Sequence, residues 1–233
     1  MISAVLFDLD DTLSPQSTWL DGAWVDVAHV GAGLGAPEVS LLAALRTIAA
    51  DGTDRGRIID RALVCVGCGD LPVAPLVAAF RDHAPPKLFP YPGVRAALEQ
   101  LRRRVPIGLV TDGDPRIQHS KLEALGLDFD VIVFSDDLGR EHRKPDPLPL
   151  RIALERLRVT PDRAIFIGDR PSKDIAAAHT VGMRSIRVRT GEYAHLPDDP
   201  APWRTAPDAV AACAIVGGLL TRPGVGTGQV SPV

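Results

Sequence analysis

Residues 4–12 read AVLFDLDDT, four apolar residues followed by three aspartates within four positions. The apolar run Ala4–Phe7 is too short for a helix and predicts a buried strand. Carboxylates as close as those of Asp8 and Asp10 raise each other's pKa, so the pair persists only where a cation or a proton is shared. A divalent ion with oxygen ligands is the natural partner for such a pair. The stretch therefore predicts a strand that ends in a chemical site.

Three further apolar runs have a similar length and also predict buried strands: Ile107–Val110, Val131–Phe134 and Ala164–Ile167. A fifth run, Ser185–Val188, is interrupted by Arg187 and is interpreted as an edge strand. Helical patterns lie between or after these runs, at Val94–Leu101, Ile117–Leu125, Leu148–Leu157 and Lys173–His179. Strands that alternate with helices predict an α/β fold, a Rossmann-like parallel sheet with helices on both faces.

The interval 15–88 breaks this alternation, because it holds helical patterns and no convincing strand. The patterns cover Trp19–His29, Val39–Ala50, Arg57–Cys65 and Val73–His83. We interpret residues 15–88 as a helical cap domain inserted into a core domain that consists of residues 1–14 and 89–233. The glycine-rich run Gly31–Ala36 follows no strand, so it is interpreted as a loop between cap helices and not as a nucleotide site.

The last third of the chain gives weaker signals. The segment Pro197–Pro207 is rich in proline and aspartate and predicts irregular structure, and residues 224–233 are expected to be disordered. The apolar run Ala209–Leu220 contains glycine and is too short to span a bilayer.

Composition limits the possible partners and compartment. The 233 residues carry a net charge of −3, which gives no general attraction to nucleic acid or to an anionic membrane. The basic run Arg102–Arg104 closes a helical pattern and is interpreted as a solvated helix end. Three cysteines, with Cys65 and Cys68 as a lone CxxC pair, form no disulfide or zinc framework. With no signal peptide visible, a cytoplasmic protein of open oligomeric state is expected.

Polar side chains follow each of the first four predicted strands, where the ligands of an open parallel sheet bind. In chain order they are Asp8 and Asp10, then Thr111 and Asp112, then Lys144, then Asp169 and Asp174. Each has an ordinary alternative when taken alone, since Thr111 and Asp169 could cap helices and Lys144 could be a solvated loop lysine. Asp11 is interpreted as a turn or capping residue. The joint order of the others favours one common site.

These residues resemble the four motifs of the haloacid dehalogenase (HAD) superfamily, in its phosphatase branch. The motifs are Asp8-x-Asp10-x-Thr12, Thr111, Lys144 and Gly168-Asp169-(x)4-Asp174. The resemblance covers the chain to about Arg189. It also includes the placement of a helical cap immediately after the first strand.

The resemblance implies a phosphatase that hydrolyses a small-molecule phosphomonoester, such as a sugar phosphate or a nucleoside monophosphate. Asp8 would attack phosphorus and form an aspartyl-phosphate. Asp10 would protonate the leaving oxygen and later take a proton from water. Thr111 and the Asp112 backbone would bind the phosphate, and Lys144 would offset the charge of Asp8 and the phosphoryl group.

The resemblance also implies Mg²⁺ as cofactor. The ion would be held by the Asp8 side chain, the Asp10 backbone carbonyl and Asp169, and Asp174 would support these ligands.

Other functions remain open at this point. A phosphomutase uses the same motifs, and a phosphoacceptor module of the receiver type or a non-catalytic HAD-like binding protein would need no turnover. A dehalogenase is less expected, because its chemistry needs neither a general acid at Asp10 nor a metal. Whether Trp19, Trp24 or His142 contacts the substrate also stays open.

Overall fold

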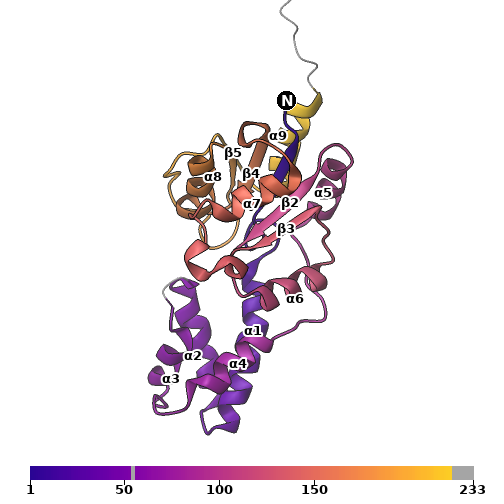
Figure 1. The fold of residues 1–233 in the computed structure, drawn as a ribbon. Coiled ribbons are helices and arrows are strands. Elements are labelled where there is room, and N and C mark those ends of the chain that lie inside the picture. The colour runs from indigo at the N-terminus through magenta and orange to yellow at the C-terminus, as the bar shows by residue number, and fades with distance from the viewer. Residues whose placement is uncertain (54–55, 222–233) are drawn as a thin grey trace, which may run out of the picture.

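The computed structural model describes residues 1–53 and 56–221 of the chain. Within these residues one sheet of six parallel strands has the order β3-β2-β1-β4-β5-β6 (Figure 1). The strands are β1 (Ala4–Phe7), β2 (Ile107–Thr111), β3 (Val131–Phe134), β4 (Ala164–Gly168), β5 (Arg184–Val188) and β6 (Arg204–Ala206). The predicted α/β fold with a Rossmann-like parallel sheet is confirmed.

The first strand lies in the middle of the sheet. Val5 of β1 is aligned with Ile107 of β2 on one side and with Ile165 of β4 on the other. All four residues of β1 are buried, as expected for a parallel strand that is covered on both faces. The acidic stretch that follows β1 is therefore delivered to the centre of the sheet's carboxyl edge.

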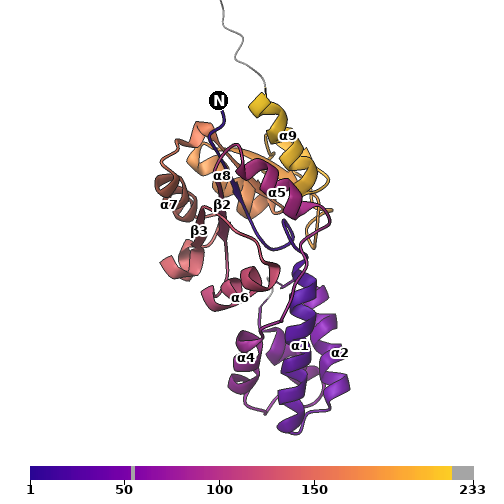
Figure 2. The same cartoon turned by 90° about the vertical axis from the view of Figure 1, so that its right-hand side faces the viewer.

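Helices cover both faces of the sheet (Figure 2). On one face α5 (Val94–Arg102) and α9 (Ala209–Thr221) pack with the odd-numbered residues of β1. On the other face α7 (Leu148–Leu157) and α8 (Ala176–Val181) pack against Leu6 and Phe166. A further helix, α6 (Pro115–Leu125), follows β2 and lies beside the carboxyl edge (Figure 1).

Four helices from the predicted cap lie beyond the carboxyl edge of the sheet (Figures 1 and 2). They are α1 (Gln16–Gly33), α2 (Glu38–Ala50), α3 (Ile58–Cys65) and α4 (Val73–Asp82). They share an apolar cluster that includes Trp24, Leu41 and Leu76. We keep the name cap for residues 15–88; its boundaries as a domain stay a prediction.

The turn between β1 and α1 depends on Asp11. This residue has φ +58°, and its carboxylate accepts a hydrogen bond from the backbone N–H of Gln16 at the start of α1, at 3.0 Å. The same carboxylate accepts a second bond from the N–H of Glu192, at 3.1 Å. Asp11 is thus the turn residue that the sequence predicted, and it also ties the loop after β5 to the entry of the cap.

The interpretation of Ser185–Val188 as an edge strand is wrong. β5 lies between β4 and β6, and Arg187 is fully buried within it. The guanidinium donates to the backbone oxygens of Asp169, Tyr193 and Leu196, at 3.2, 2.8 and 2.8 Å. An arginine can occupy an interior strand here because these carbonyl groups replace its hydration and the carboxylate of Asp198 forms an ion pair with Nη1.

Two further predictions need correction. β6 lies within Pro197–Pro207, which was expected to be irregular. Gly31–Gly33 belongs to α1, so the expected loop begins only at Leu34. A Cβ on Gly31 would lie 2.5 Å from Leu41 Cδ2, and the missing side chain lets α2 pack closely on α1. The predicted disorder of residues 224–233 lies outside the described residues.

In the described part of the chain, no helix combines the length and the apolar character needed to cross a membrane. The run Ala209–Leu220 forms most of α9, which packs against α5.

Candidate active site

The strand ends bring the predicted residues together. Asp8 follows β1 and its backbone N–H donates to Ile167 of β4 at 2.9 Å. Thr111 ends β2, and Asp169 directly follows β4. All seven predicted side chains line one cavity of about 830 Å³ between the sheet and the cap: Asp8, Asp10, Thr111, Asp112, Lys144, Asp169 and Asp174. Their common placement agrees with the joint order noted in the sequence.

Lys144 is a buried ammonium at the base of the cavity. Its Nζ lies 2.5 Å from Asp8 Oδ1 and 2.8 Å from Asp174 Oδ1, and it donates to the Val110 carbonyl at 3.2 Å. Burial alone would lower the pKa of Lys144, but the carboxylates of Asp174 and Asp8 raise this pKa above its ordinary value. The lysine is therefore a fixed positive charge beside Asp8.

Three carboxyl groups, those of Asp8, Asp169 and Asp174, each offer an oxygen within 4.8 Å of the others. Burial, opposed by Lys144 and reinforced by Asp174, raises the pKa of Asp8 to about 7. Burial and the neighbouring carboxylates of Asp174 and Asp8 hold the pKa of Asp169 well above its usual range. Each shift shows that negative charge at this cluster lacks full compensation from the protein.

The hydrogen bonds show which of these carboxylates is free to bind a cation. Asp174 Oδ2 accepts from the N–H of Arg170 at 2.9 Å, and Oδ1 lies 2.8 Å from Lys144 Nζ as an ion pair, although it accepts no hydrogen bond from the described residues. Both oxygens of Asp169 are buried and have no hydrogen-bond partner among the described residues. A buried carboxylate without a partner lowers the free energy of unfolding by roughly several kcal/mol unless a cation offsets its charge. Asp169 and Asp8 therefore fit a divalent cation directly, and Asp174 fits a supporting position.

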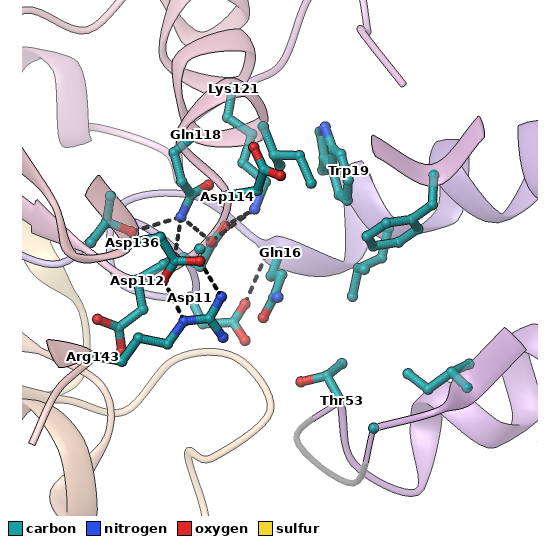
Figure 3. Close-up of a pocket in the computed structure, with 18 of the residues that line it drawn as sticks. Asp11, Gln16, Trp19, Thr53, Asp112, Asp114, Gln118, Lys121, Asp136 and Arg143 are labelled. Carbon is teal, nitrogen blue, oxygen red and sulfur yellow. Dashed lines mark hydrogen bonds and ion pairs between the residues drawn. The ribbon is translucent and has the colours of Figure 1, made fainter. Parts of the chain in front are cut away.

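Asp10 is held by helix α6. Lys121 Nζ lies 2.7 and 2.8 Å from the two carboxylate oxygens of Asp10, and Gln118 Nε2 lies 3.1 Å from one of them. Gln118 Nε2 also donates to Thr111 Oγ1 and to the Asp112 carbonyl, both at 2.7 Å. Figure 3 shows Gln118 and Lys121 extending from α6 into this part of the cavity.

Gln118 and Lys121 were not found by the sequence reasoning. They lie three residues apart and so share one helix face, yet both are buried. A sequence signal did exist, because α6 carries a glutamine and a lysine on its otherwise apolar inner face, beside Leu122 and Leu125. Polar residues at such positions need a buried partner.

Asp112 fastens the loop that carries Lys144. Its Oδ1 accepts from Ser135 Oγ at 2.6 Å and from the backbone N–H of Lys144 at 3.1 Å. Asp136 and Arg143 hold the two ends of the segment that leads to Lys144. The Asp136 carboxylate accepts two hydrogen bonds from the Arg143 guanidinium, at 2.5 and 2.6 Å (Figure 3). The Asp112 side chain therefore supports the position of Lys144, in addition to the backbone role expected from the sequence.

The cap contributes an aromatic wall. Trp19, Trp24 and Phe80 line the cavity, with Trp24 stacked on Phe80 at 4.8 Å and Trp19 edge-on to Phe80 at 5.1 Å. Both tryptophans named in the sequence analysis thus face the cavity, whereas His142 is not among the described residues that line it. The mixture of aromatic walls and charged groups is typical of a small-molecule site.

Cap and core also meet at the cavity mouth. Glu192, in the loop after β5, accepts hydrogen bonds from the backbone N–H and from Oγ1 of Thr53, at 3.1 and 2.9 Å. Thr53 lies three residues after the end of α2 and lines the cavity (Figure 3). These hydrogen bonds connect the cap to the core beside the cavity.

Comparison with known proteins finds phosphatases among the relatives of this chain. The chain is 37% identical over 215 residues to a glyceraldehyde 3-phosphate phosphatase of Methanopyrus kandleri, which covers 87% of this chain and 91% of that protein. It is 32% identical over 206 residues to a phosphoglycolate phosphatase of Rhodospirillum rubrum, covering 82% of this chain and 81% of that protein.

A solved structure similar to this fold is a 2-haloacid dehalogenase from Pseudomonas syringae pv. Tomato DC3000. It shares 27% identity, with a TM-score of 0.65 over 94% of this chain and 100% of that chain. A family model for haloacid dehalogenase-like hydrolases matches residues 2–182, which include every predicted site residue. The chain therefore belongs to the haloacid dehalogenase-like hydrolase family, as the order of its strand-end motifs indicated.

Proposed function

We propose that this protein is a Mg²⁺-dependent phosphatase that hydrolyses a small-molecule phosphomonoester through an aspartyl-phosphate on Asp8. One observation supports this most strongly. Asp8 is a buried carboxylate that is paired with Lys144 on one side and lies beside the unpartnered Asp169 on the other. An anionic nucleophile between a fixed ammonium and a cation-binding carboxylate suits attack on a phosphoryl group.

In the first half-reaction an Asp8 oxygen forms a bond to phosphorus while the bond from phosphorus to the leaving oxygen breaks. Asp10 gives that oxygen its proton. In the second half-reaction water attacks phosphorus, Asp10 takes the proton of the water, and inorganic phosphate leaves Asp8. Throughout, Lys144 and Thr111 would neutralise and bind the phosphoryl oxygens.

Mg²⁺, when bound, would supply positive charge to the transferring phosphoryl group. The residues that would hold it are Asp8, Asp169 and the backbone carbonyl of Asp10. Asp174 would orient this set from its bonds to Lys144 and the Arg170 N–H.

The relatives suggest the size of the substrate. Proteins named for glyceraldehyde 3-phosphate and phosphoglycolate are among the similar phosphatases, and a cap closed over the site favours small esters over protein substrates. We therefore propose a phosphorylated metabolite, with sugar phosphates and nucleoside monophosphates also within the class. The cytoplasmic location and the lack of nucleic-acid or membrane partners stay predictions from the sequence.

Two other activities are separated from this one by their products. A phosphomutase would use the same residues but return the phosphoryl group to the substrate. A dehalogenase would release halide without metal, and the two unpartnered oxygens of Asp169 argue against it, because such a site has no need of a cation ligand.

A phosphate-release screen with Mg²⁺ tests the proposal. The panel contains glyceraldehyde 3-phosphate, phosphoglycolate, phosphoserine, hexose phosphates, nucleoside monophosphates and 4-nitrophenyl phosphate, with L-2-chloropropionate as a dehalogenase control. We expect free phosphate from at least one metabolite, and loss of that activity in excess chelator. Halide release from the control, or isomerised product without free phosphate, would contradict the proposal.

Replacing Asp169 with asparagine tests the metal site apart from turnover. The amide removes an uncompensated buried charge, so in chelator the variant should be more stable than the wild type by about 1–3 kcal/mol. Mg²⁺ should raise the melting temperature of the wild type and leave that of Asp169→Asn nearly unchanged. Thermal unfolding with and without Mg²⁺ measures both effects, and an equal Mg²⁺ shift in the two proteins would exclude Asp169 as a ligand.

A further inference from the structure

Lys121 is a buried lysine that the four motifs do not contain. It lies on α6, is 3% exposed, and directs Nζ at Asp10. Removing an ammonium group from water costs roughly several kcal/mol. The neighbouring inward-facing residues of α6, Leu122 and Leu125, are apolar. A purely structural role at this position would be filled more cheaply by another apolar residue. The buried charge of Lys121 therefore indicates a role beyond packing.

The contacts of Lys121 join the core to the cap. Its Nζ lies within 2.8 Å of both oxygens of Asp10 in the core, and 4.9 Å from the ring centre of Trp19 in the cap. Ammonium groups are attracted to an aromatic face at such a distance. Lys121, Asp10 and Trp19 all line the cavity, so the ammonium lies where the non-phosphate part of a substrate would meet Asp10.

Gln118, the second neighbour of Asp10, cannot provide the same support. Its amide nitrogen has two protons but three acceptors in reach. Thr111 Oγ1 and the Asp112 carbonyl lie at 2.7 Å, while the Asp10 oxygen lies at 3.1 Å. The amide therefore shares its two protons among three acceptors, and its bond to Asp10 is longer than either contact from Lys121. The orientation of the Asp10 carboxyl group therefore depends mainly on Lys121.

We propose that Lys121 is a positioning residue that aims Asp10 at the leaving-group oxygen. This inference rests on the proposed function, in which Asp10 protonates that oxygen. A general acid must lie within hydrogen-bond reach of the atom that it protonates. If the Asp10 carboxyl group were poorly oriented, the hydrolysis rate would therefore fall. The fall would be largest for esters whose leaving oxygen most needs a proton.

The experiment compares two substrates in Lys121→Met, which keeps an unbranched side chain only one heavy atom shorter and removes its charge. One substrate is the best alkyl phosphate from the screen, and the other is 4-nitrophenyl phosphate, whose leaving group departs without a proton. The value of kcat/KM reports the steps up to release of the leaving group. We expect a loss on the order of 100-fold for the alkyl ester and less than about 10-fold for the aryl ester.

Asp10→Asn should show the same selective loss. The double variant Lys121→Met/Asp10→Asn should be no slower than Asp10→Asn alone, because Lys121 acts through Asp10. Lys87→Met is the matched control, since Lys87 is exposed and also lies 4.9 Å from an aromatic ring, that of Phe89, away from the cavity. It should change neither rate.

Three outcomes would overturn the inference: equal losses on the two esters, no loss in Lys121→Met, or additive losses in the double variant. Lys121→Gln, which retains one donor for Asp10, should lose less than Lys121→Met and provides a second variant if the methionine protein unfolds. If the wild type hydrolyses neither ester, the proposed function itself fails. A substrate-selective loss supports both proposals.

Discussion

Asp8→Asn is expected to abolish phosphate release, by a factor on the order of 10⁴ or more, while leaving the protein folded. The amide cannot attack phosphorus, so no covalent intermediate forms. The fold should persist because Lys144 keeps its ion pair with Asp174, at 2.8 Å. The substitution also removes a buried carboxyl group whose pKa burial raises to about 7, so the metal-free variant should not be less stable than the wild type.

Phosphate release, thermal unfolding and a crystal soaked with Mg²⁺ and beryllium fluoride measure these effects. The wild type should carry the fluoride adduct on the Asp8 carboxylate, and the variant should carry none. Asp137→Asn is the control, because Asp137 is an exposed carboxylate in the loop that leads to Lys144. Mg²⁺-dependent activity in Asp8→Asn above one hundredth of the wild-type rate would exclude Asp8 as the nucleophile.

Lys144→Ala should have the second-largest effect, because it removes a catalytic charge and a structural one together. We expect a loss of at least about 100-fold in activity, as for other preorganised groups that stabilise the transition state. The carboxylates of Asp8 and Asp174 would then lie buried without their ammonium, which should cost about 3–5 kcal/mol of unfolding free energy. The destabilisation distinguishes this variant from Asp8→Asn.

Urea unfolding and steady-state kinetics test both parts of this expectation. Mg²⁺ should restore some of the lost stability, since a cation at Asp169 and Asp8 replaces part of the missing charge. Lys87→Ala serves as control, because this exposed lysine has no buried carboxylate partner among the described residues. Unchanged stability and rate in Lys144→Ala would place the lysine outside the site.

The sequence predicted most of the core because local pattern and tertiary structure agree there. Ala4–Phe7 and Val131–Phe134 are strands with the expected bounds. Short apolar runs between helices have few alternatives to a buried parallel strand. The site followed from the same rule, because the carboxyl ends of parallel strands meet at one edge and carry Asp8, Thr111 and Asp169 to it.

The errors arose where a residue's environment is made by distant segments. Arg187 suggested an edge strand because an arginine inside a sheet normally meets water. Its hydrogen-bond acceptors, the carbonyls of Asp169, Tyr193 and Leu196 and the carboxylate of Asp198, converge only after folding. Lys121 was missed for a similar reason, since Asp10 lies 111 positions earlier in the chain. Local periodicity carries no record of such partners.

The insertion of the cap directly after β1 affects how the chain is made on the ribosome. β1 is synthesised first, but its neighbours β2 and β4 begin only at Ile107 and Ala164. The helices α1–α4, which share their own apolar cluster, are complete by Asp82. Pairing over such sequence separations is slow and leaves apolar strands open to aggregation. A nascent chain halted before Ile107 would carry assembled helices and, ahead of them, the apolar β1 segment without a strand partner.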